Sequence, residues 1–284
     1  MKSAGIVVLY NPQIENIRNI KEYVNKVNIM IILDNSDVDN FDIIKQYIYI
    51  DNVRTIYIHF KKNIGLCSAL NKGFEIANKN KCEWVLIMDD DSSFNNNIVE
   101  VYEKYLNMND SEDIAVLSPV HLYDRSNNCM YDGVKSIKWA MTSGCFYNLK
   151  IFNLLKGFYE PLFVECLDLD YCYRALENNY KVYECGNAGL NHQPAETKEF
   201  KIFGKKIFKY GYASPWRYFM QARSLIWLIL RYHHFGDLVK LLWKYFKVIF
   251  FFDNKKLFLS EMHKGIKEGL EIYISYKKNG ERRK

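Results

Sequence analysis

The side chains best suited to a chemical role are three consecutive carboxylates that follow an apolar run. Asp89, Asp90 and Asp91 come directly after Val85–Met88 in the segment VLIMDDDSSF. If that run is a buried strand, Asp89 and Asp91 lie on one side of the chain, because strand side chains alternate. A divalent cation would relieve their repulsion, and Mg²⁺ or Mn²⁺ commonly binds one or two carboxylates together with substrate phosphates. A solvated turn after the strand would also explain the triplet.

A site of this kind depends on a sheet to hold it, and the first hundred residues alternate the patterns of strands and helices. We expect strands over Ile6–Tyr10, Ile29–Asp34, Val53–Phe60 and Trp84–Asp89, and helices up to Val24, over Asp42–Tyr49 and over Gly65–Lys79. Further strands are expected over Ile114–Val120, Met141–Leu149 and Val182–Cys185, and further helices over Glu165–Asn178, Pro215–Arg231 and Asp237–Phe252. Such alternation with short connections indicates an α/β domain with a mainly parallel sheet.

Polar residues stand where each of the first four expected strands ends. They are Tyr10-Asn11, Asp34-Asn35-Ser36, Asn63-Ile64-Gly65 and the aspartate triplet. Each group alone is ordinary turn chemistry. In a parallel sheet, however, the carboxyl ends of the strands share one edge, and ligands bind there. Four such groups on one edge favour a binding site.

Charge is distributed unevenly along the chain of 284 residues. Residues from Phe200 to Lys284 carry 19 Lys and Arg against 6 Asp and Glu, a balance of +13, and residues 1–199 have a balance of −7. An acidic body with a basic tail indicates two surfaces with different partners. Nucleic acid, anionic lipid or a phosphorylated substrate would each suit the tail.

The cysteines and the apolar runs bear on the expected compartment. The seven cysteines are scattered without a CxxC pair, which is typical of reduced thiols. The apolar run at Gly5–Tyr10 is too short for a signal peptide, and three lysines interrupt the longest candidate for a membrane span, Leu238–Phe252. We therefore expect a cytoplasmic protein.

A series of sequence blocks occurs in a fixed order over about residues 4–230. The blocks are VVLYNP, IILDNSD, NIGLCSALNKG (Asn63–Gly73), MDDDS, the segment Thr142–Arg174, GLNHQ (Gly189–Gln193) and SPWRYFMQARSLIWL (Ser214–Leu228). This series resembles the glycosyltransferase family 2 enzymes of the GT-A fold, especially the rhamnosyltransferase-like branch. The resemblance implies a Rossmann-like mixed, mainly parallel sheet flanked by helices.

The resemblance also implies residues that bind the nucleotide sugar. Tyr10 would pack on the base, Asp34 would accept a hydrogen bond from its imide, and Asn63 and Asn71 would help to shape the base and ribose pocket. Asp89 would contact the ribose or the donor sugar. Further residues of these blocks are expected to line the same pocket: Asn11, Asn35, Gly65, Asp90 and Arg223.

The metal and the base follow from the same blocks. Asp91, together with Asp89, would hold Mn²⁺ or Mg²⁺ on the diphosphate, and His192 matches a position that often completes this site. Asp168 matches the base that deprotonates the acceptor hydroxyl. Glu165 is a second candidate, since it lies three residues away on an expected helix start and shares its face. Acidic residues are also favoured at a helix start by the helix dipole, and this reading suits Asp170 better than Asp168.

Some residues depart from the family pattern. Ser224 replaces the usual Asn after Arg223, and the Q-x-x-R-W motif of processive synthases is absent, so we do not expect processive extrusion. Arg223 would bind the diphosphate bidentately or lie on a helix surface. The remaining histidines lack acidic or Cys partners at ligand spacing and are expected to be structural or superficial: His59, His121, His233, His234 and His263.

The tail contains one helical apolar face with lysines among its residues. The face comprises Leu238, Val239, Leu241, Leu242, Tyr245, Phe246 and Ile249, and the lysines are Lys240, Lys244 and Lys247. Packing on the catalytic domain is the first interpretation. Peripheral attachment to the anionic inner face of a membrane is the second, and we expect some of both.

These observations define the hypothesis that the structure is to test. We expect a GT-A catalytic domain over residues 1–200, with a nucleotide-sugar half (1–110) and an acceptor half (111–200), and a basic helical region over 201–284. The expected activity is metal-dependent, inverting transfer of one sugar, rhamnose from dTDP-rhamnose first or a UDP-hexose, to a saccharide or lipid-linked glycan for cell-surface polysaccharide. No nucleic-acid partner is expected, and a homodimer is left open. A nucleotidyltransferase and a non-catalytic membrane- or nucleic-acid-binding protein are the alternatives.

Overall fold

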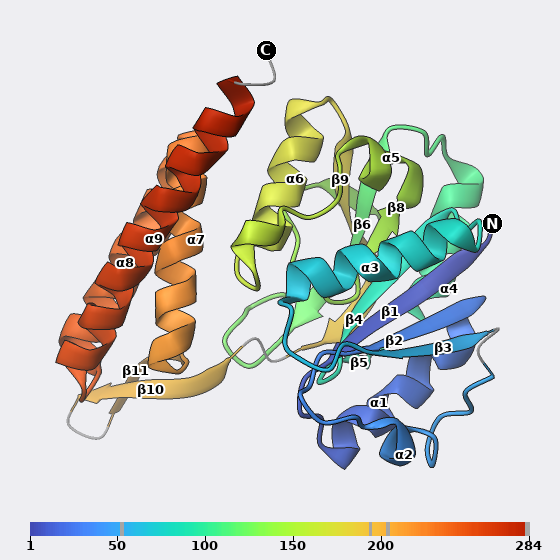
Figure 1. The fold of residues 1–284 in the computed structure, drawn as a ribbon, viewed down its shortest axis with the longest axis horizontal. Helices are drawn as coiled ribbons and strands as arrows, with labels where there is room; N and C mark the ends of the chain where they lie inside the picture. Colours follow the sequence, from blue (N-terminus) through green and yellow to red (C-terminus); the bar gives the residue numbers. More distant parts are fainter. Residues whose placement is uncertain (52–53, 193–194, 203–204, 282–284) are drawn as a thin grey trace. The chain divides into compact units, whose positions relative to one another are not determined.

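The computed structural model describes residues 1–51, 54–192, 195–202 and 205–281. The chain forms two compact units (Figure 1). The first comprises Met1–Phe163 and Leu167–Gln193, and the second comprises Val164–Cys166 and Pro194–Lys284. The expected boundary after residue 200 falls within a strand of the second unit.

Four parallel strands form the first half of the sheet in unit 1. They are β1 (Ser3–Leu9), β2 (Ile29–Asp34), β3 (Thr55–His59) and β4 (Trp84–Asp89), in the spatial order β3-β2-β1-β4. Every residue of β2 is buried, as the uninterrupted apolar run predicts for a strand covered on both faces. The third expected strand began at Val53, which lies outside the described residues.

The other half of the sheet is mixed. Strand β8 (Phe146–Asn148) pairs antiparallel with β4 and with β6 (Ile114–Leu122), and β6 pairs in parallel with β9 (Lys181–Asn191). The short strands β5 (Ser93–Phe94) and β7 (Val134–Ser136) pair antiparallel with β9. The expected strand Met141–Leu149 is therefore only three residues long, whereas β9 extends well beyond the expected Val182–Cys185.

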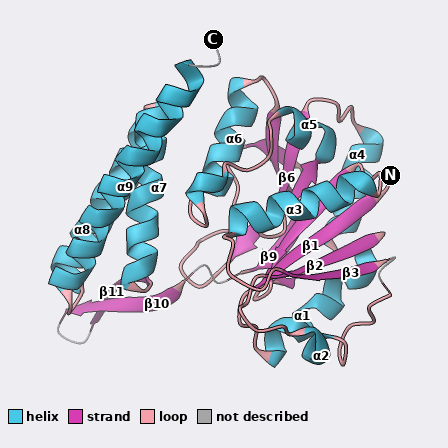
Figure 2. Ribbon diagram, viewed as in Figure 1, coloured by secondary structure: helices cyan, strands magenta, loops and turns pink. Residues whose placement is uncertain are grey.

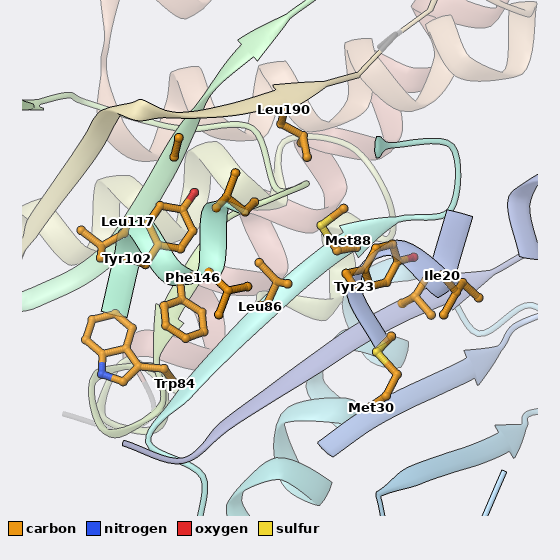
Figure 3. Packing of buried hydrophobic residues seen from close by; sticks show 14 of the residues in the cluster. Ile20, Tyr23, Met30, Trp84, Leu86, Met88, Tyr102, Leu117, Phe146 and Leu190 are labelled. Carbon is orange, nitrogen blue, oxygen red and sulfur yellow. The ribbon is translucent and has the colours of Figure 1, made fainter. Parts of the chain in front are cut away.

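Helices cover both faces of this sheet (Figure 2). One face carries α1 (Ile14–Tyr23), α2 (Phe41–Ile44) and α4 (Ile98–Met108), whose buried residues share one core with Met30, Leu86 and Phe146 (Figure 3). The other face carries α3 (Leu66–Lys79), α5 (Leu149–Leu154) and α6 (Leu167–Glu177). Single helical turns follow at Val24–Lys26 and Glu160–Leu162. This layered architecture confirms the expected mixed, mainly parallel sheet flanked by helices.

Aromatic rings fix the helices of the second face. Phe74 of α3 stacks on Phe152 of α5 at 3.5 Å between ring centroids, and Phe158 and Tyr171 close the cluster against Tyr147 of β8. Tyr171 belongs to α6, so one aromatic cluster joins α3, α5 and α6 to the sheet. The start of α6, which carries Asp168, is positioned by this packing.

Unit 2 is a β-hairpin with three long helices. The hairpin consists of β10 (Glu196–Ile202) and β11 (Lys205–Tyr212), and the helices are α7 (Pro215–Tyr232), α8 (Phe235–Phe251) and α9 (Lys255–Glu281). Ser214 caps α7 by accepting a hydrogen bond from the Arg217 amide, and Pro215 occupies the first turn. Within the described residues, no helix is both long enough and apolar enough to cross a membrane.

Helices α7 and α9 approach each other at two glycines. A Cβ atom on Gly265 would lie 2.2 Å from the Phe219 carbonyl oxygen, and one on Gly269 would lie 2.3 Å from that of Arg223. These positions are one helical turn apart, so the two glycines form a smooth strip against which the backbone of α7 rests. The ion pair between Arg223 and Glu268 (Nε to Oε1, 2.6 Å) lies beside this strip.

Gly269→Ala should therefore destabilise unit 2, because the contacted atoms are backbone and the helices must separate. We expect a loss of about 1–3 kcal/mol, seen as faster amide hydrogen exchange in both α7 and α9. Gly236→Ala is the matched control, since nothing lies within 4 Å of a Cβ there. That change should be neutral or slightly stabilising. Equal protection in the two variants would contradict the close approach.

Candidate active site

The register of the parallel strands brings their carboxyl ends together. Leu9 is paired with Asp34, Asp34 with His59, and Val8 with Asp89. The Asn35 amide donates to the Leu9 carbonyl (2.8 Å), and the Phe60 amide donates to that of Asp34 (2.9 Å). The polar residues that follow these strands therefore share one edge of the sheet.

Tyr10 and Asn11 form the rim of this edge beyond β1. The Tyr10 side chain is 52% exposed, as a ring available to stack on a flat ligand would be. Asn11 has a left-handed backbone (φ 50°), and its amide donates to Ser36 Oγ at 2.7 Å. This turn holds the loop after β1 against the loop after β2.

The Asp34 carboxylate is fully buried and is the anchor of the loop that follows β2. Its Oδ2 accepts from the Tyr57 hydroxyl (2.6 Å) and from the Asn40 backbone and side-chain amides (3.0 Å each), and its Oδ1 accepts from the Ser36 amide. Burial raises the pKa of Asp34, but these hydrogen bonds outweigh burial and lower it. Asp34 thus orders the loop as an ionised acceptor.

Tyr57 is a site residue that the sequence did not indicate. Its hydroxyl bridges Asp34 and Asp39, at 2.6 and 2.7 Å. The only signal available was the pairing of β3 with β2, which places Tyr57 opposite Ile32, two residues before the strand end. An aromatic residue in a strand is normally read as core, so composition alone could not reveal this role.

Asn35, Asn63 and Gly65 form a second network at the same edge. Asn35 Nδ2 donates to Asn63 Oδ1 (3.0 Å), Asn35 Oδ1 accepts from the Ile64 amide (2.9 Å), and the Gly65 amide donates to Asn63 Oδ1 (2.9 Å). Gly65 has φ +86°, and a Cβ there would lie 2.5 Å from the Phe163 ring. Only glycine suits this start of α3.

Asn71 supports a loop of the fold. Its Nδ2 donates to the Phe158 carbonyl (3.0 Å) and to Glu160 (3.2 Å), and its Oδ1 accepts from the Phe158 amide (2.9 Å). Sequence reasoning expected it to shape the nucleotide pocket. In the structure its side chain holds segment 158–160, and its contact with a nucleotide stays a prediction.

Asp89, Asp91 and His192 come together as a three-ligand group. One donor atom from each lies within 4.8 Å of the others. His192 Nε2 is 3.8 Å from Asp89 Oδ2, and His192 Nδ1 is 3.6 Å from Asp91 Oδ1. The pairing of β5 with β9, with Ser93 opposite Asn191, brings His192 beside residues a hundred positions earlier. Two carboxylates and one imidazole suit a divalent metal ion.

A line of polar residues stands behind this group. Ser92 Oγ lies 2.9 Å from His192 Nδ1. Ser143 Oγ donates to Ser92 Oγ (2.8 Å) and accepts from the Asp89 amide (3.0 Å). His121 Nε2 lies 2.7 Å from the Ser143 carbonyl oxygen, and burial lowers the pKa of His121 to about 4. The sequence patterns did not mark Ser92 and Ser143 as site residues. They indicated that His121 is structural or superficial, and here it supports the Ser143 carbonyl.

The carboxylates and His192 shift one another's protonation. Burial raises the pKa of Asp90 to about 7, and the charges of Asp91 and Asp89 add to the shift. Burial lowers the pKa of His192, but the hydrogen bond to Asp91 and the charges of Asp89 and Asp91 outweigh burial and raise it above 6.5. A cation at this point would offset the repulsion among the three aspartates.

The acidic residues near the start of α6 differ in their surroundings. Asp168 is half-buried, and its Oδ1 accepts from the Leu169 amide at 2.8 Å. Asp170 is fully buried and pairs with Arg174 (Oδ2 to Nη2, 2.8 Å), which also donates to the carbonyls of Leu155 and Gly157. Asp170 therefore ties α6 to the loop after α5, while Asp168 has the accessible position.

Glu165 and Arg223 both belong to unit 2. Glu165 Oε1 lies 2.6 Å from Arg217 Nε and accepts a longer hydrogen bond from Gln221 (3.5 Å). Arg223 is buried and pairs with Glu268, so it is not a helix-surface arginine. Gln193, the last residue of the block that contains His192, lies outside the described residues.

Comparison with known proteins agrees with this fold. The profile of glycosyl transferase family 2 matches residues 11–155. The dTDP-rhamnosyl transferase RfbF of Shigella flexneri is 23% identical over 250 residues, which cover 81% of this chain and 80% of that protein. The crystal structure of GalNAc-T7 with UDP, GalNAc and Mn²⁺ has a TM-score of 0.58 at 10% identity. It covers 80% of this chain, which spans about half of that one (47%).

The topology and the structural similarity define a fold of the GT-A class. The chain belongs to glycosyl transferase family 2, so it is a glycosyltransferase, and it is similar to a dTDP-rhamnosyl transferase.

Replacing one ligand should separate the roles of neighbouring carboxylates. Asp91→Asn should weaken Mn²⁺ binding by more than about tenfold, because a neutral amide replaces a charged carboxylate ligand. Asp90→Asn, adjacent and identical in chemical change, should have a much smaller effect, since Asp90 lies outside the three-ligand group. Isothermal titration of both variants with MnCl₂ measures the difference. Equal losses would mean that only net charge matters.

Metal affinity should also depend on pH. A metal binds neutral histidine, so protonation of His192 competes with Mn²⁺ up to its raised pKa, and affinity should keep rising with pH above 6.5. Ionisation of Asp90 near pH 7 acts in the same direction. Titrations of Asp90→Asn isolate the His192 contribution, and His192→Asn isolates that of Asp90. A pH-independent affinity in Asp90→Asn would exclude His192 as a ligand.

Proposed function

We propose that this protein is a metal-dependent, inverting glycosyltransferase that moves one sugar from a nucleotide diphosphate sugar to a saccharide acceptor. The grouping of Asp89, Asp91 and His192 at the carboxyl edge carries the proposal. Rhamnose from a dTDP donor is the first choice, because the similar protein from Shigella flexneri is named for that activity. A UDP-hexose is the second choice.

The three ligands would hold Mn²⁺ in preference to Mg²⁺, since an imidazole nitrogen is a poorer ligand for the harder ion. When bound, the cation would supply positive charge that neutralises the diphosphate as it leaves. Ser92 and Ser143 fix the imidazole and the end of β4, so the ligands are oriented in advance.

The nucleotide would lie along the remaining edge. Tyr10 supplies an exposed ring for the base, and the loop held by Asp34 supplies its polar contacts. Asn35, Asn63 and Gly65 hold the next loop in place. Asp34 would meet the base imide only through its Oδ1 side, because Oδ2 is already occupied by Asn40 and Tyr57.

Asp168 is the proposed base. Its carboxylate would take the proton of the acceptor hydroxyl as that oxygen attacks the anomeric carbon. The bond from that carbon to the diphosphate oxygen would break on the opposite face, which inverts the configuration. Asp170 is excluded from this role because Arg174 holds it in the core. Glu165 remains the competing candidate.

The acceptor and the setting extend the proposal. We take the acceptor to be a saccharide, free or carried on a lipid, used in cell-surface polysaccharide and met in the cytoplasm. Membership of glycosyl transferase family 2 sets aside the nucleotidyltransferase and the non-catalytic alternatives.

A donor panel tests the activity. Purified protein with Mn²⁺ should release nucleotide from one donor among dTDP-rhamnose, UDP-glucose, UDP-galactose and UDP-galactofuranose, and chelation of the metal should stop the release. Failure with every donor would contradict the proposal, and preference for a UDP-hexose would contradict the first choice of donor.

Asp168→Asn should leave donor binding within about twofold and lower transfer by at least about a hundredfold, the contribution of a general base. Glu165→Gln tests the competing assignment, and Glu177→Gln, exposed on the same helix, is the control. If Glu165→Gln stops transfer while Asp168→Asn remains active, the base has been assigned to the wrong carboxylate.

A further inference from the structure

Helix α8 presents a continuous row of large apolar side chains to the outside. Counted from the first of them, they stand at i, i+3, i+4, i+7, i+8, i+11, i+14 and i+15, so they lie on one helical face. We call this row the α8 stripe. Its members, between 37% and 76% exposed, are Phe235, Leu238, Val239, Leu242, Trp243, Phe246, Ile249 and Phe250.

The polar residues of α8 lie on the opposite face, against the rest of unit 2. Lys247 is 7% exposed and donates to the Gly211 carbonyl (3.1 Å), and Asp237, 1% exposed, pairs with Lys240 (2.9 Å). Lys244 donates to Gln221 Oε1 (2.7 Å), and burial lowers its pKa. The helix is therefore reversed: its charges point inward and its apolar stripe points outward.

This reversal is costly unless something apolar covers the stripe. Packing within unit 2 buries Leu241 and Val248 beside the lysines but leaves the larger side chains of the stripe in water, so it does not explain why the outer face is apolar. The stripe runs along a helix of 17 residues, or about 25 Å. Contiguous apolar surfaces of this extent mark sites that bind another apolar surface.

Basic residues stand beside one end of the stripe. The hairpin packs on the C-terminal half of α8 (Figure 1). The ring centroids of Phe208 and Trp243 are 6.5 Å apart, and those of Phe200 and Phe251 are 4.7 Å apart. The hairpin and the start of α9 carry exposed lysines: Lys201, Lys205, Lys206, Lys255 and Lys256. Ile207, between them on β11, is 55% exposed.

An open pocket joins the basic hairpin to the stripe. It has a volume of about 630 Å³, and its lining includes Lys198, Lys201, Phe250 and Phe251 as well as Glu199, which pairs with Lys201 (Nζ to Oε2, 3.3 Å). Two lysines and several aromatic rings thus share one depression with a single carboxylate, a lining that suits a group that is anionic at one end and apolar at the other.

We infer that the α8 stripe lies on an anionic lipid bilayer, parallel to its surface, with the hairpin lysines at the headgroups. The inward lysines of α8 keep their partners within unit 2, so no charge enters the hydrocarbon. A second copy of the chain fits less well. A twofold interface between two stripes would cover the apolar side chains, but it would offer no anionic groups to the exposed lysines beside one end of each stripe. This inference does not depend on the donor proposed above.

Vesicle flotation of the purified full chain tests the inference. The protein should float with phosphatidylcholine vesicles that contain phosphatidylglycerol, and float at least about tenfold less with phosphatidylcholine alone or in high salt. Leu242→Glu with Phe246→Glu should lower binding to the mixed vesicles by at least about tenfold. The matched control is Met108→Glu with Leu154→Glu, two exposed apolar residues of unit 1 that should leave binding unchanged.

A second measurement avoids inserting charges. Mixed vesicles should shift the tryptophan emission of the wild-type protein to the blue, and Trp243→Phe should abolish most of the shift. The inference is overturned if the stripe variant floats like the wild type, if neutral and anionic vesicles bind equally, or if Trp243→Phe leaves the shift intact. It is also overturned if light scattering shows that the wild type is a dimer, that the stripe variant is a monomer, and that the wild type binds neither kind of vesicle.

Discussion

The parallel register of β1, β2, β3 and β4 is the constraint on which unit 1 depends. Because Leu9, Asp34, His59 and Asp89 end their strands at one level, four chain segments must turn within the same small region. Each turn has backbone groups to satisfy, and Asp34, Asn35 and Ser36 satisfy many of them. The site is therefore made partly of residues that the sheet needs for its own completion. The antiparallel pairing of β5 with β9 then adds His192 from the other half of the chain.

Electrostatics divides the residues of this edge into two kinds. Asp34 is buried, but its donors hold it ionised, so it behaves as part of the scaffold. In the aspartate triplet, burial raises the pKa of Asp90 to about 7, and the charges of Asp91 and Asp89 add to the shift. Two aspartates at one sheet edge thus differ: hydrogen bonds keep Asp34 ionised, whereas burial and neighbouring charges favour the protonated form of Asp90.

The sequence predicted the sheet edge well and the second unit poorly, for physical reasons. Apolar runs ending in polar residues are local signals, and they located Asp34, Asn63 and Asp89. Tyr57, Ser92 and Ser143 act through partners distant in sequence, so no local pattern marks them. In α8 the helical periodicity was evident, but periodicity alone does not tell which face of a helix packs on the rest of the unit. Whether Leu242 or Lys247 faces inward depends on the Gly211 carbonyl and on Gln221, acceptors that only the folded unit supplies. The glycine strip of α9 could not be predicted either. In the sequence Gly265 and Gly269 are only weak helix formers, and their role depends on the contact with α7.

If the α8 stripe lies on a bilayer as we infer, the reversed helix has a kinetic consequence. A protein bound to a membrane surface searches a plane for its acceptor instead of a volume. It therefore meets an acceptor anchored in that membrane far more often than the same number of acceptors in solution. The effective concentration set by such confinement replaces affinity that the pocket would otherwise have to provide. An enzyme organised in this way can tolerate a weak, quickly released acceptor contact, which allows rapid turnover. The outward-facing Trp243 and Phe246 of α8 would then govern how often the reaction starts, without touching either substrate.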